Sequence, residues 1–214
     1  QAIGGGTAYD AAIAALAREG RDARGILEAL AVEDVARAAD AFRPIYDMAG
    51  GNDGFVSLEV APDLAHDADG TVAEARRLWA AVDRPNLMIK VPGTAEGLPA
   101  VTRLIADGIN VNVTLLFSVE MYRRVIAAYV RGLEQRVEAG RPLDAVRSVA
   151  SFFVSRVDTE VDKRLEAKIA AATDAAARSR LEGLLGKAAV ANAVVAYQAY
   201  EAGFMAPAVR TLMG

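Results

Sequence analysis

Lys90 is the residue whose type and position most suggest chemistry. It lies in a short apolar run, residues 86–91, that ends at Pro-Gly. Such a run is typical of a buried parallel strand, which normally carries Val, Ile or Leu. An ammonium group buried without a counter-ion is costly, and the pKa of such a group usually falls. A lysine that is partly neutral at pH 7 can attack a carbonyl and form a Schiff base. The alternative is a strand-end lysine that reaches solvent or pairs with a carboxylate.

Polar residues recur at matching positions in four strand-like runs. Side chains alternate along a strand, and each run has one apolar face and one face with polar groups. The polar faces carry Glu59, Lys90, Asn112, Thr114 and Ser151. Packing alone rarely explains a polar residue on the same face of four successive strands. A barrel with its site at the carboxyl ends of the strands explains this convergence better than an open sheet does.

The elements that would position these residues alternate between strand and helix. The strand-like runs cover residues 54–60, 86–91, 110–117 and 147–154. We expect helices at residues 9–18, at 26–48 as one or two segments, from a cap at 69–71 to 82, at 94–106, from a Ser118 cap to about 139, and after 154 to about 202. This alternation predicts an α/β fold with parallel strands and crossover helices.

The amino-acid composition limits the classes to which the protein can belong. The chain has 214 residues, of which 53% are hydrophobic, and this suits one domain of ordinary size. The net charge of −4 and the lack of a basic block make nucleic acid and anionic membranes poor partners. The chain has no cysteine, no signal peptide and no apolar run near the ~20 residues that span a bilayer. We therefore expect a cytoplasmic protein with no metal and no cofactor.

Four motifs give the chain a resemblance to a known family. They are DGFVSLEV at 53–60, LMIKVPGT at 87–94, GINVNVTLLFS at 108–118 and ASFFVSRVD at 150–158. With these motifs in this order, the chain resembles the transaldolases of the class I, Schiff-base kind, which are built on a (β/α)8 TIM barrel. It is most similar to the longer bacterial transaldolases, including those fused to a glucose-6-phosphate isomerase domain.

The resemblance implies catalytic roles for three residues, matched position by position. Lys90 would form the Schiff base, and Glu59 with Thr114 would hold the catalytic water. Each role has a plainer alternative. Glu59 could serve only as the ion-pair partner of Lys90, and Thr114 could be a satisfied core hydroxyl.

The resemblance implies substrate contacts for three further residues. Asn112 and Ser151 would bind hydroxyl groups of a dihydroxyacetone unit, and Arg156 would bind the substrate phosphate through parallel hydrogen bonds. Here too the alternatives are structural. Ser151 and Asn112 could be core polar groups, and Arg156 could form a surface ion pair with Asp158 or Glu160. We expect His66, the sole histidine, to be solvated.

The implied activity moves a dihydroxyacetone unit from a ketose phosphate, such as sedoheptulose 7-phosphate or fructose 6-phosphate, to an aldose phosphate. The pathway would be the non-oxidative pentose phosphate pathway, with sugar phosphates as the partners. One alternative is a fructose-6-phosphate aldolase, which shares the barrel and the lysine but releases free dihydroxyacetone. Another is a non-catalytic barrel fragment that binds sugar phosphates or assembles with a complementary half.

The family barrel has eight strands, whereas four are visible here and match its third to sixth. We expect residues 1–214 to form a single partial barrel domain that lacks strands 1, 2, 7 and 8. Strand 1 would bring an aspartate for acid–base work, and strand 7 a second phosphate-binding arginine. We expect this internal fragment to be weak or inactive alone. Its open edges and uncovered inner face would favour association, so an oligomer is possible.

Overall fold

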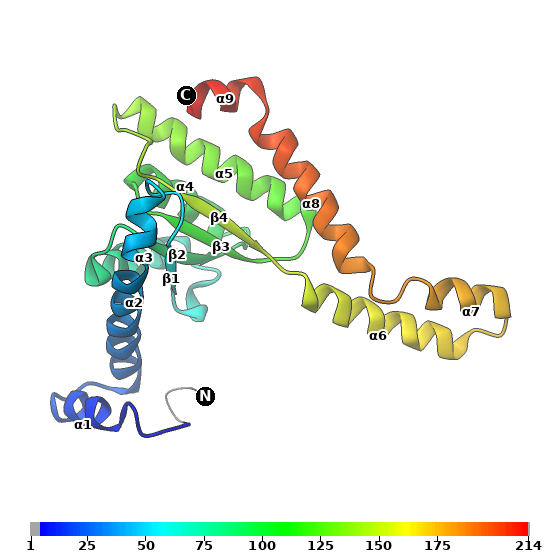
Figure 1. Ribbon diagram of the computed structural model, residues 1–214, viewed down its shortest axis with the longest axis horizontal. Helices are drawn as coiled ribbons and strands as arrows, with labels where there is room; N and C mark the ends of the chain where they lie inside the picture. Colours follow the sequence, from blue (N-terminus) through cyan, green and yellow to red (C-terminus); the bar gives the residue numbers. More distant parts are fainter. Residues whose placement is uncertain (1–4, 214) are drawn as a thin grey trace.

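A four-stranded parallel sheet forms the centre of the computed structural model, which describes residues 5–213 (Figure 1). The strands lie side by side in chain order: β1 (Val56–Glu59), β2 (Leu87–Pro92), β3 (Val111–Leu116) and β4 (Ser148–Phe152). The crossovers between them contain α3 (Ala68–Val82), α4 (Gly97–Asp107) and α5 (Val119–Glu138). The predicted α/β class with four parallel strands is confirmed, and it fits a partial barrel.

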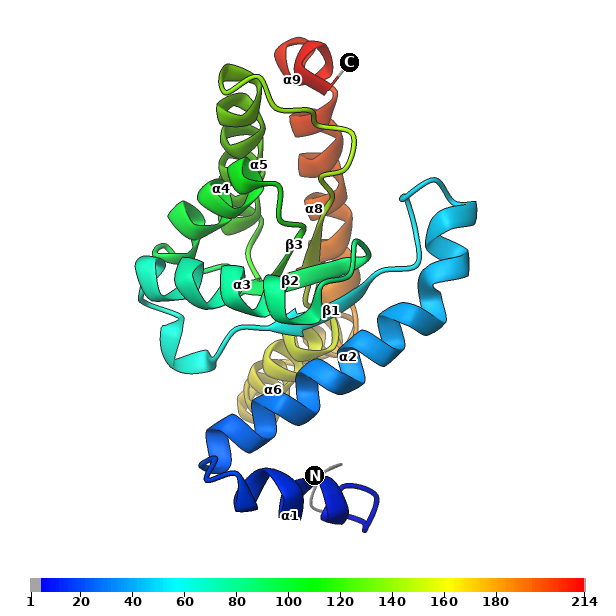
Figure 2. The same cartoon turned by 90° about the vertical axis from the view of Figure 1, so that its left-hand side faces the viewer.

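One face of the sheet is buried under α3, α4 and α5, which Figure 2 shows together on one side of the strands. The strands contribute aliphatic side chains that are fully buried: Leu87, Ile89, Val91, Val111 and Val113. The helices bury an apolar stripe against them that includes Leu78, Val101, Leu104 and Leu133. Each such side chain stabilises the fold by roughly 1.5–3 kcal/mol relative to exposure. The polar residues of the candidate site lie on the opposite face of the sheet.

Side-chain caps set where several helices begin. Ser118 accepts a hydrogen bond from the amide of Met121 at 3.1 Å and caps α5, as predicted. The predicted cap of α3 at residues 69–71 is wrong, because Asp67 accepts the amide hydrogen of Gly70 at 2.9 Å. The helix therefore begins at Ala68, at least two residues before the predicted start. The segment expected to hold one or two helices is the single helix α2 (Ala23–Met48).

Two buried asparagines hold the amino-terminal ends of the strands together. The amide of Asn110 donates to the carbonyls of Pro85 and Leu87, and its oxygen accepts from the backbone amide of Arg147. The amide of Asn86 donates to the carbonyls of Ala39 and Gly54. These bonds align the strand starts, so that the carboxyl ends open on the same side.

The remaining elements lie outside this core. They are α1 (Asp10–Arg18), the short 3-10 helix η1 (Pro62–Leu64), α6 (Ser155–Ala171), α7 (Ala175–Glu182), α8 (Ala188–Phe204) and α9 (Pro207–Met213). In Figure 1, α6 and α7 project away from the sheet, and α8 returns to lie along α5. The helical region predicted to end near residue 202 continues to α9. Within residues 5–213, no helix is long and apolar enough to cross a membrane.

Candidate active site

Lys90 and Glu59 form an ion pair near the carboxyl ends of β2 and β1. They are register partners in the parallel ladder, and Lys90 Nζ lies 3.1 Å from Glu59 Oε2. The Lys90 side chain is 29% exposed and that of Glu59 is 45% exposed. Of the two readings of Lys90, the structure thus shows the lysine paired with a carboxylate, and its role as the Schiff-base residue stays a prediction. Register places a carboxylate beside it, and the carboxyl ends of the strands are open to solvent.

A chain of hydrogen bonds joins three polar side chains across the same face. Asn112 on β3 is the register partner of Lys90. The hydroxyl of Ser151 donates to Asn112 Oδ1 at 2.7 Å, and Asn112 Nδ2 donates to Ser57 Oγ at 3.1 Å. The predicted convergence of Asn112 and Ser151 is confirmed. Both side chains are half-buried on this face, and their roles as substrate contacts stay a prediction.

Ser57 is not among the predicted site residues, although the sequence carries a signal for it. It lies two residues before Glu59, so both side chains point to the same face of β1. A serine hydroxyl on an apolar strand is a weaker signal of a site than the charged side chain of Glu59. Only the contact with Asn112, which lies two strands away, shows that Ser57 belongs to the cluster.

Thr114 lies two residues beyond Asn112 and is 2% exposed. Its register partner is Pro92, and its backbone carbonyl accepts the amide hydrogen of Gly93 at 2.7 Å. Among the described residues, the other polar side chains of the strands form two groups: the ion pair of Lys90 with Glu59, and the hydrogen-bonded Ser57, Asn112 and Ser151. No hydrogen bond or ion pair links the Thr114 side chain to either group. Its assignment to a catalytic water stays a prediction.

An irregularity in β3 directly follows Thr114. The pairing of β3 with β4 shifts register between Val113 and Leu116, and Leu115 has a left-handed φ of 60°. For a leucine this conformation costs roughly 1–2 kcal/mol. Bulges of this kind are over-represented beside active sites, where they redirect side chains.

Arg156 lies in the first turn of α6 and stacks on an aromatic pair. Its guanidinium carbon is 4.5 Å from the centre of the Phe153 ring, and that ring stacks on Phe117 at 4.9 Å with an angle of 10° between the planes. Stacking over a ring face leaves the N–H edges of a guanidinium available for hydrogen bonds. The arrangement suits recognition of an oxyanion.

The alternative that Arg156 pairs with a nearby carboxylate is wrong. Asp158 accepts the backbone amide hydrogen of Ala189 at 2.7 Å. Glu160 pairs instead with Arg164, one helical turn further on, at 2.9 Å. Within residues 5–213, no carboxylate lies in salt-bridge distance of Arg156.

His66 lies outside the cluster, as expected. Its side chain is 79% exposed, and its Nδ1 atom is 3.2 Å from Glu96 Oε2. In the described ranges, no three His, Asp or Glu side chains lie close enough to hold a metal ion.

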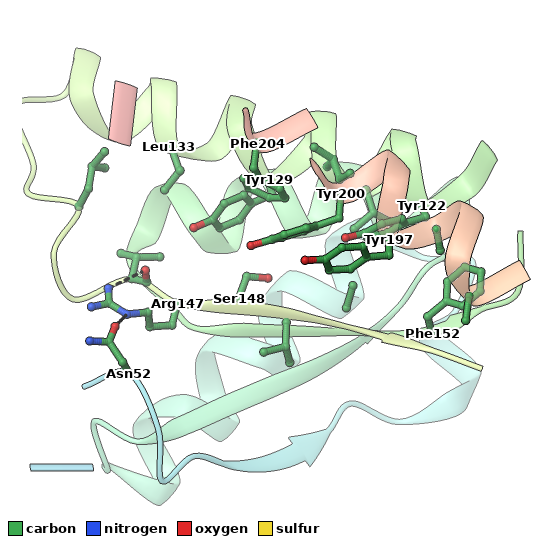
Figure 3. A pocket seen from close by; sticks show the side chains of 18 of the residues that line it. Asn52, Tyr122, Tyr129, Leu133, Arg147, Ser148, Phe152, Tyr197, Tyr200 and Phe204 are labelled. Carbon is green, nitrogen blue, oxygen red and sulfur yellow. Dashed lines mark hydrogen bonds between the residues drawn. The ribbon is translucent and has the colours of Figure 1, made fainter. Parts of the chain in front are cut away.

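A hollow of about 920 Å³ lies away from Lys90, between α5, α8 and β4 (Figure 3). Its walls are mostly apolar and aromatic, and they include Tyr129, Tyr200 and Phe204. Burial raises the pKa of the Tyr129 hydroxyl. On β4 the lining includes Ser148, Val149, Ala150 and Phe152 but not Ser151, so residues of both faces of the strand line the hollow. The hollow therefore follows the edge of β4 that no described strand pairs with, and it does not include the residues of the polar cluster.

The fold and the cluster define a class of protein. It is an α/β protein whose parallel sheet fits part of a barrel and carries a lysine amine on its polar face. A family model described as transaldolase/fructose-6-phosphate aldolase matches residues 1–213. The chain belongs to this family, and the resemblance found in its four motifs is confirmed.

Curated relatives named transaldolase support the same assignment. The protein of Thermobifida fusca is 54% identical over 204 residues, 95% of this chain. That of Saccharopolyspora erythraea is 53% identical over 207 residues, also 95%. That of Trichodesmium erythraeum is 48% identical over 201 residues, 94%. These alignments cover 53%, 52% and 53% of the relatives, so the chain spans about half their length.

Proposed function

We propose that the whole protein represented by this chain is a transaldolase. It transfers a dihydroxyacetone unit from a ketose phosphate, such as sedoheptulose 7-phosphate or fructose 6-phosphate, to an aldose phosphate. The observation that carries the proposal is the position of Lys90 beside Glu59 and Asn112, in a family whose curated relatives are named transaldolase. We assign the reaction to the non-oxidative pentose phosphate pathway in the cytoplasm, consistent with a chain that has no cysteine.

The chemistry begins at the amine of Lys90. The neutral amine attacks the ketone carbon, and loss of water gives a protonated imine. A base takes the proton from the C4 hydroxyl, and the C3–C4 bond breaks with its electron pair flowing into the imine. An aldose phosphate leaves and an enamine remains on the lysine. The enamine then adds to the acceptor aldehyde, and water releases the new ketose.

Glu59 and Thr114 hold the water molecule that these steps release and consume. Imine formation expels a water molecule and hydrolysis consumes one, and both need protons moved at the nitrogen and oxygen. The carboxylate of Glu59, 3.1 Å from the amine, is within the range for direct proton transfer or relay through one water. The ion pair in the free protein is thus compatible with Glu59 as an ion-pair partner only and with Glu59 as a catalytic group.

Asn112, Ser151 and Arg156 orient the substrate. The Asn112 amide is the register partner of Lys90, and the Ser151 hydroxyl donates a hydrogen bond to it, so both can bond hydroxyl groups of the dihydroxyacetone unit. The guanidinium of Arg156, at the start of α6, receives the phosphate at the other end of the sugar. Its stacking on Phe153 fixes the side chain before the substrate arrives.

We also propose that the chain holds the third to sixth strands of an eight-stranded barrel. Hydrogen bonding of Ser57 to Asn112 across β2 supports this, because side chains of alternate strands meet in layers inside such barrels. The outer edges of β1 and β4 are unpaired within the described sheet. The apolar hollow beside β4 would receive the next strand and its helix in the whole protein.

The family name covers a second activity, aldol cleavage of fructose 6-phosphate to free dihydroxyacetone. Product analysis separates the two. The 214-residue chain, and a version extended to the relatives' length, are incubated with fructose 6-phosphate with or without erythrose 4-phosphate. A transaldolase gives sedoheptulose 7-phosphate only with the acceptor, and little free dihydroxyacetone. Free dihydroxyacetone at the same rate without acceptor would support the aldolase. No product from either version would support a non-catalytic protein.

A further inference from the structure

Ser57 is the member of the polar cluster to which the reaction above gives no role. It lies on β1, and Asn112 lies on β3, with β2 between them. Neighbouring strands are ~4.8 Å apart, so strands two apart are separated by roughly twice that distance. The 3.1 Å bond from Asn112 Nδ2 to Ser57 Oγ therefore spans β2, on the face that carries Lys90.

The carboxamide of Asn112 is held from both sides. Ser151 on β4 donates to its oxygen at 2.7 Å, and Ser57 on β1 accepts from its nitrogen at 3.1 Å. A carboxamide has two N–H donors and two acceptor lone pairs. One N–H and one lone pair are thus left for a ligand beside the lysine.

We propose that Ser57 is a positioning residue, which holds the Asn112 carboxamide where it meets a hydroxyl group of a polyhydroxylated ketone bound to Lys90. This inference rests on the proposed function. Asn112 does not need Ser57 for solvation, because it is half-buried on an open face that water reaches. The bond instead removes the rotational freedom of the amide before a ligand arrives, which lowers the entropy lost on binding.

The test compares Ser57→Ala with Ser57→Thr, which keeps the hydroxyl. Ser148→Ala is the matched control, because Ser148 is also a half-buried strand serine but its hydroxyl donates to the carbonyl of Val111. Two readouts are taken on the 214-residue chain and on the extended version. One is the pair of side-chain amide resonances of Asn112, assigned by their loss in Asn112→Ser. The other is borohydride trapping of fructose 6-phosphate over a range of concentrations.

Ser57→Ala is expected to shift the Asn112 resonances and to raise the half-saturating ketose concentration about tenfold, with the maximal trapping rate within about threefold. Ser57→Thr should restore both, and Ser148→Ala should change neither. If Ser57→Ala does not fold, Ser57→Cys, a weaker acceptor of similar size, gives the same reading.

Wild-type resonances and wild-type half-saturation in Ser57→Ala would overturn the inference. Equal effects of Ser57→Ala and Ser57→Thr would also overturn it, because they would reflect a general loss of packing. A wild-type chain that forms no adduct in either version would contradict the proposed function. In that case, the shift of the Asn112 amide resonances in Ser57→Ala would by itself show whether Ser57 holds Asn112.

Discussion

The ammonium of Lys90 has a carboxylate on one neighbouring strand and a carboxamide on the other. Glu59 balances its charge in the free protein, and Asn112 adds a neutral donor and acceptor. Formation of an imine turns the amine into a cation that a carboxylate on β1 still stabilises. The same three side chains thus serve the resting protein and the proposed intermediate.

Replacing Glu59 by Gln keeps the shape of the side chain but removes its charge and its capacity to relay protons. We expect turnover of fructose 6-phosphate in the extended protein to fall about a hundredfold, the usual contribution of a positioned acid or base. Glu120→Gln, at an exposed position in the first turn of α5, is the control and should change nothing. A Glu59→Gln variant at wild-type rate would leave the carboxylate as an ion-pair partner only.

Replacing Arg156 by Ala should weaken only phosphorylated substrates. We expect at least a tenfold rise in half-saturating fructose 6-phosphate, with no change for free dihydroxyacetone as donor, because a charge-assisted bond to phosphate is lost. Arg164→Ala, in the same helix but paired with Glu160, is the control. Equal weakening of both donors would show that Arg156 acts through the fold.

The sequence predicted which side chains share the polar face, because strand alternation is a local property. It missed Ser57 and left open whether Lys90 pairs with Glu59. Both points depend on the register between strands far apart in the chain, which is not visible in a single sequence. Glu59 is beside Lys90, and Ser57 within reach of Asn112, only because of how the ladders align.

The helices that position the strands pack at one place with no space for a side chain. A Cβ atom on Gly132 of α5 would lie 2.7 Å from the Thr102 carbonyl oxygen and 2.7 Å from Ile105 Cβ on α4. Glycine is unfavourable inside a helix, so its presence here reflects the close approach of two backbones. The helix layer and the sheet beneath it depend on this contact.

Gly132→Ala is therefore expected to lower the free energy of unfolding by about 1–3 kcal/mol, despite alanine's better helix propensity. In a chain of this size, thermal unfolding would shift down by roughly 2–4 °C per kcal/mol. Gly183→Ala is the control, since its Cβ would meet only ordinary contacts at 3.4 Å and beyond. A Gly132→Ala variant that is as stable as Gly183→Ala would contradict the close packing of α4 on α5.

The attachment of α2 to α3 should depend on pH. Arg77 donates hydrogen bonds to both carboxylate oxygens of Glu28, and these bonds hold the pKa of that carboxyl below its ordinary value of 4.5. Because the folded pKa is the lower one, this stabilisation is complete above about pH 4.5 and is lost as the pH falls through the folded pKa.

Glu28→Gln should therefore melt below the wild type at pH 7, and the difference should shrink below pH 4.5. The control is Glu160→Gln, which removes an exposed ion pair within one helix and should leave the melting temperature unchanged. A difference for Glu28→Gln that persists unchanged at pH 3 would contradict the linkage.

Some features of the elements could not be predicted from the sequence. The left-handed Leu115 in β3 carries no local signal, because leucine is disfavoured in that conformation and only tertiary contacts hold it there. The predicted start of α3 is wrong because three candidate caps, Asp67, Asp69 and Thr71, lie within five residues. Which of them caps depends on where the preceding chain leaves the sheet.

Among residues 5–213, no strand pairs with the outer edge of β1 or of β4, and an apolar hollow follows the edge of β4. The helix α8 beside that hollow exposes Val190, Val194 and Tyr197. Exposed strand edges and apolar patches favour association between molecules. We attribute these surfaces to contacts that the rest of an eight-stranded barrel would make.

A version extended at both ends to the relatives' length should melt at a higher temperature than the 214-residue chain. It should also sediment with less concentration-dependent association, because new strands would pair with β1 and β4. Analytical ultracentrifugation and thermal unfolding measure both effects. Equal stability and equal association of the two versions would argue against the partial barrel.

The most direct test is to map the imine. The extended protein is mixed with fructose 6-phosphate, reduced with borohydride, digested and analysed by mass spectrometry. The chain offers its own controls, because its three other lysines, Lys163, Lys168 and Lys187, lie on or beside the outer helices. We predict a dihydroxyacetone adduct on Lys90 alone, which is absent in Lys90→Met. An adduct spread equally over Lys90 and these three lysines, or none at all, would contradict the assignment of Lys90 as the Schiff-base residue.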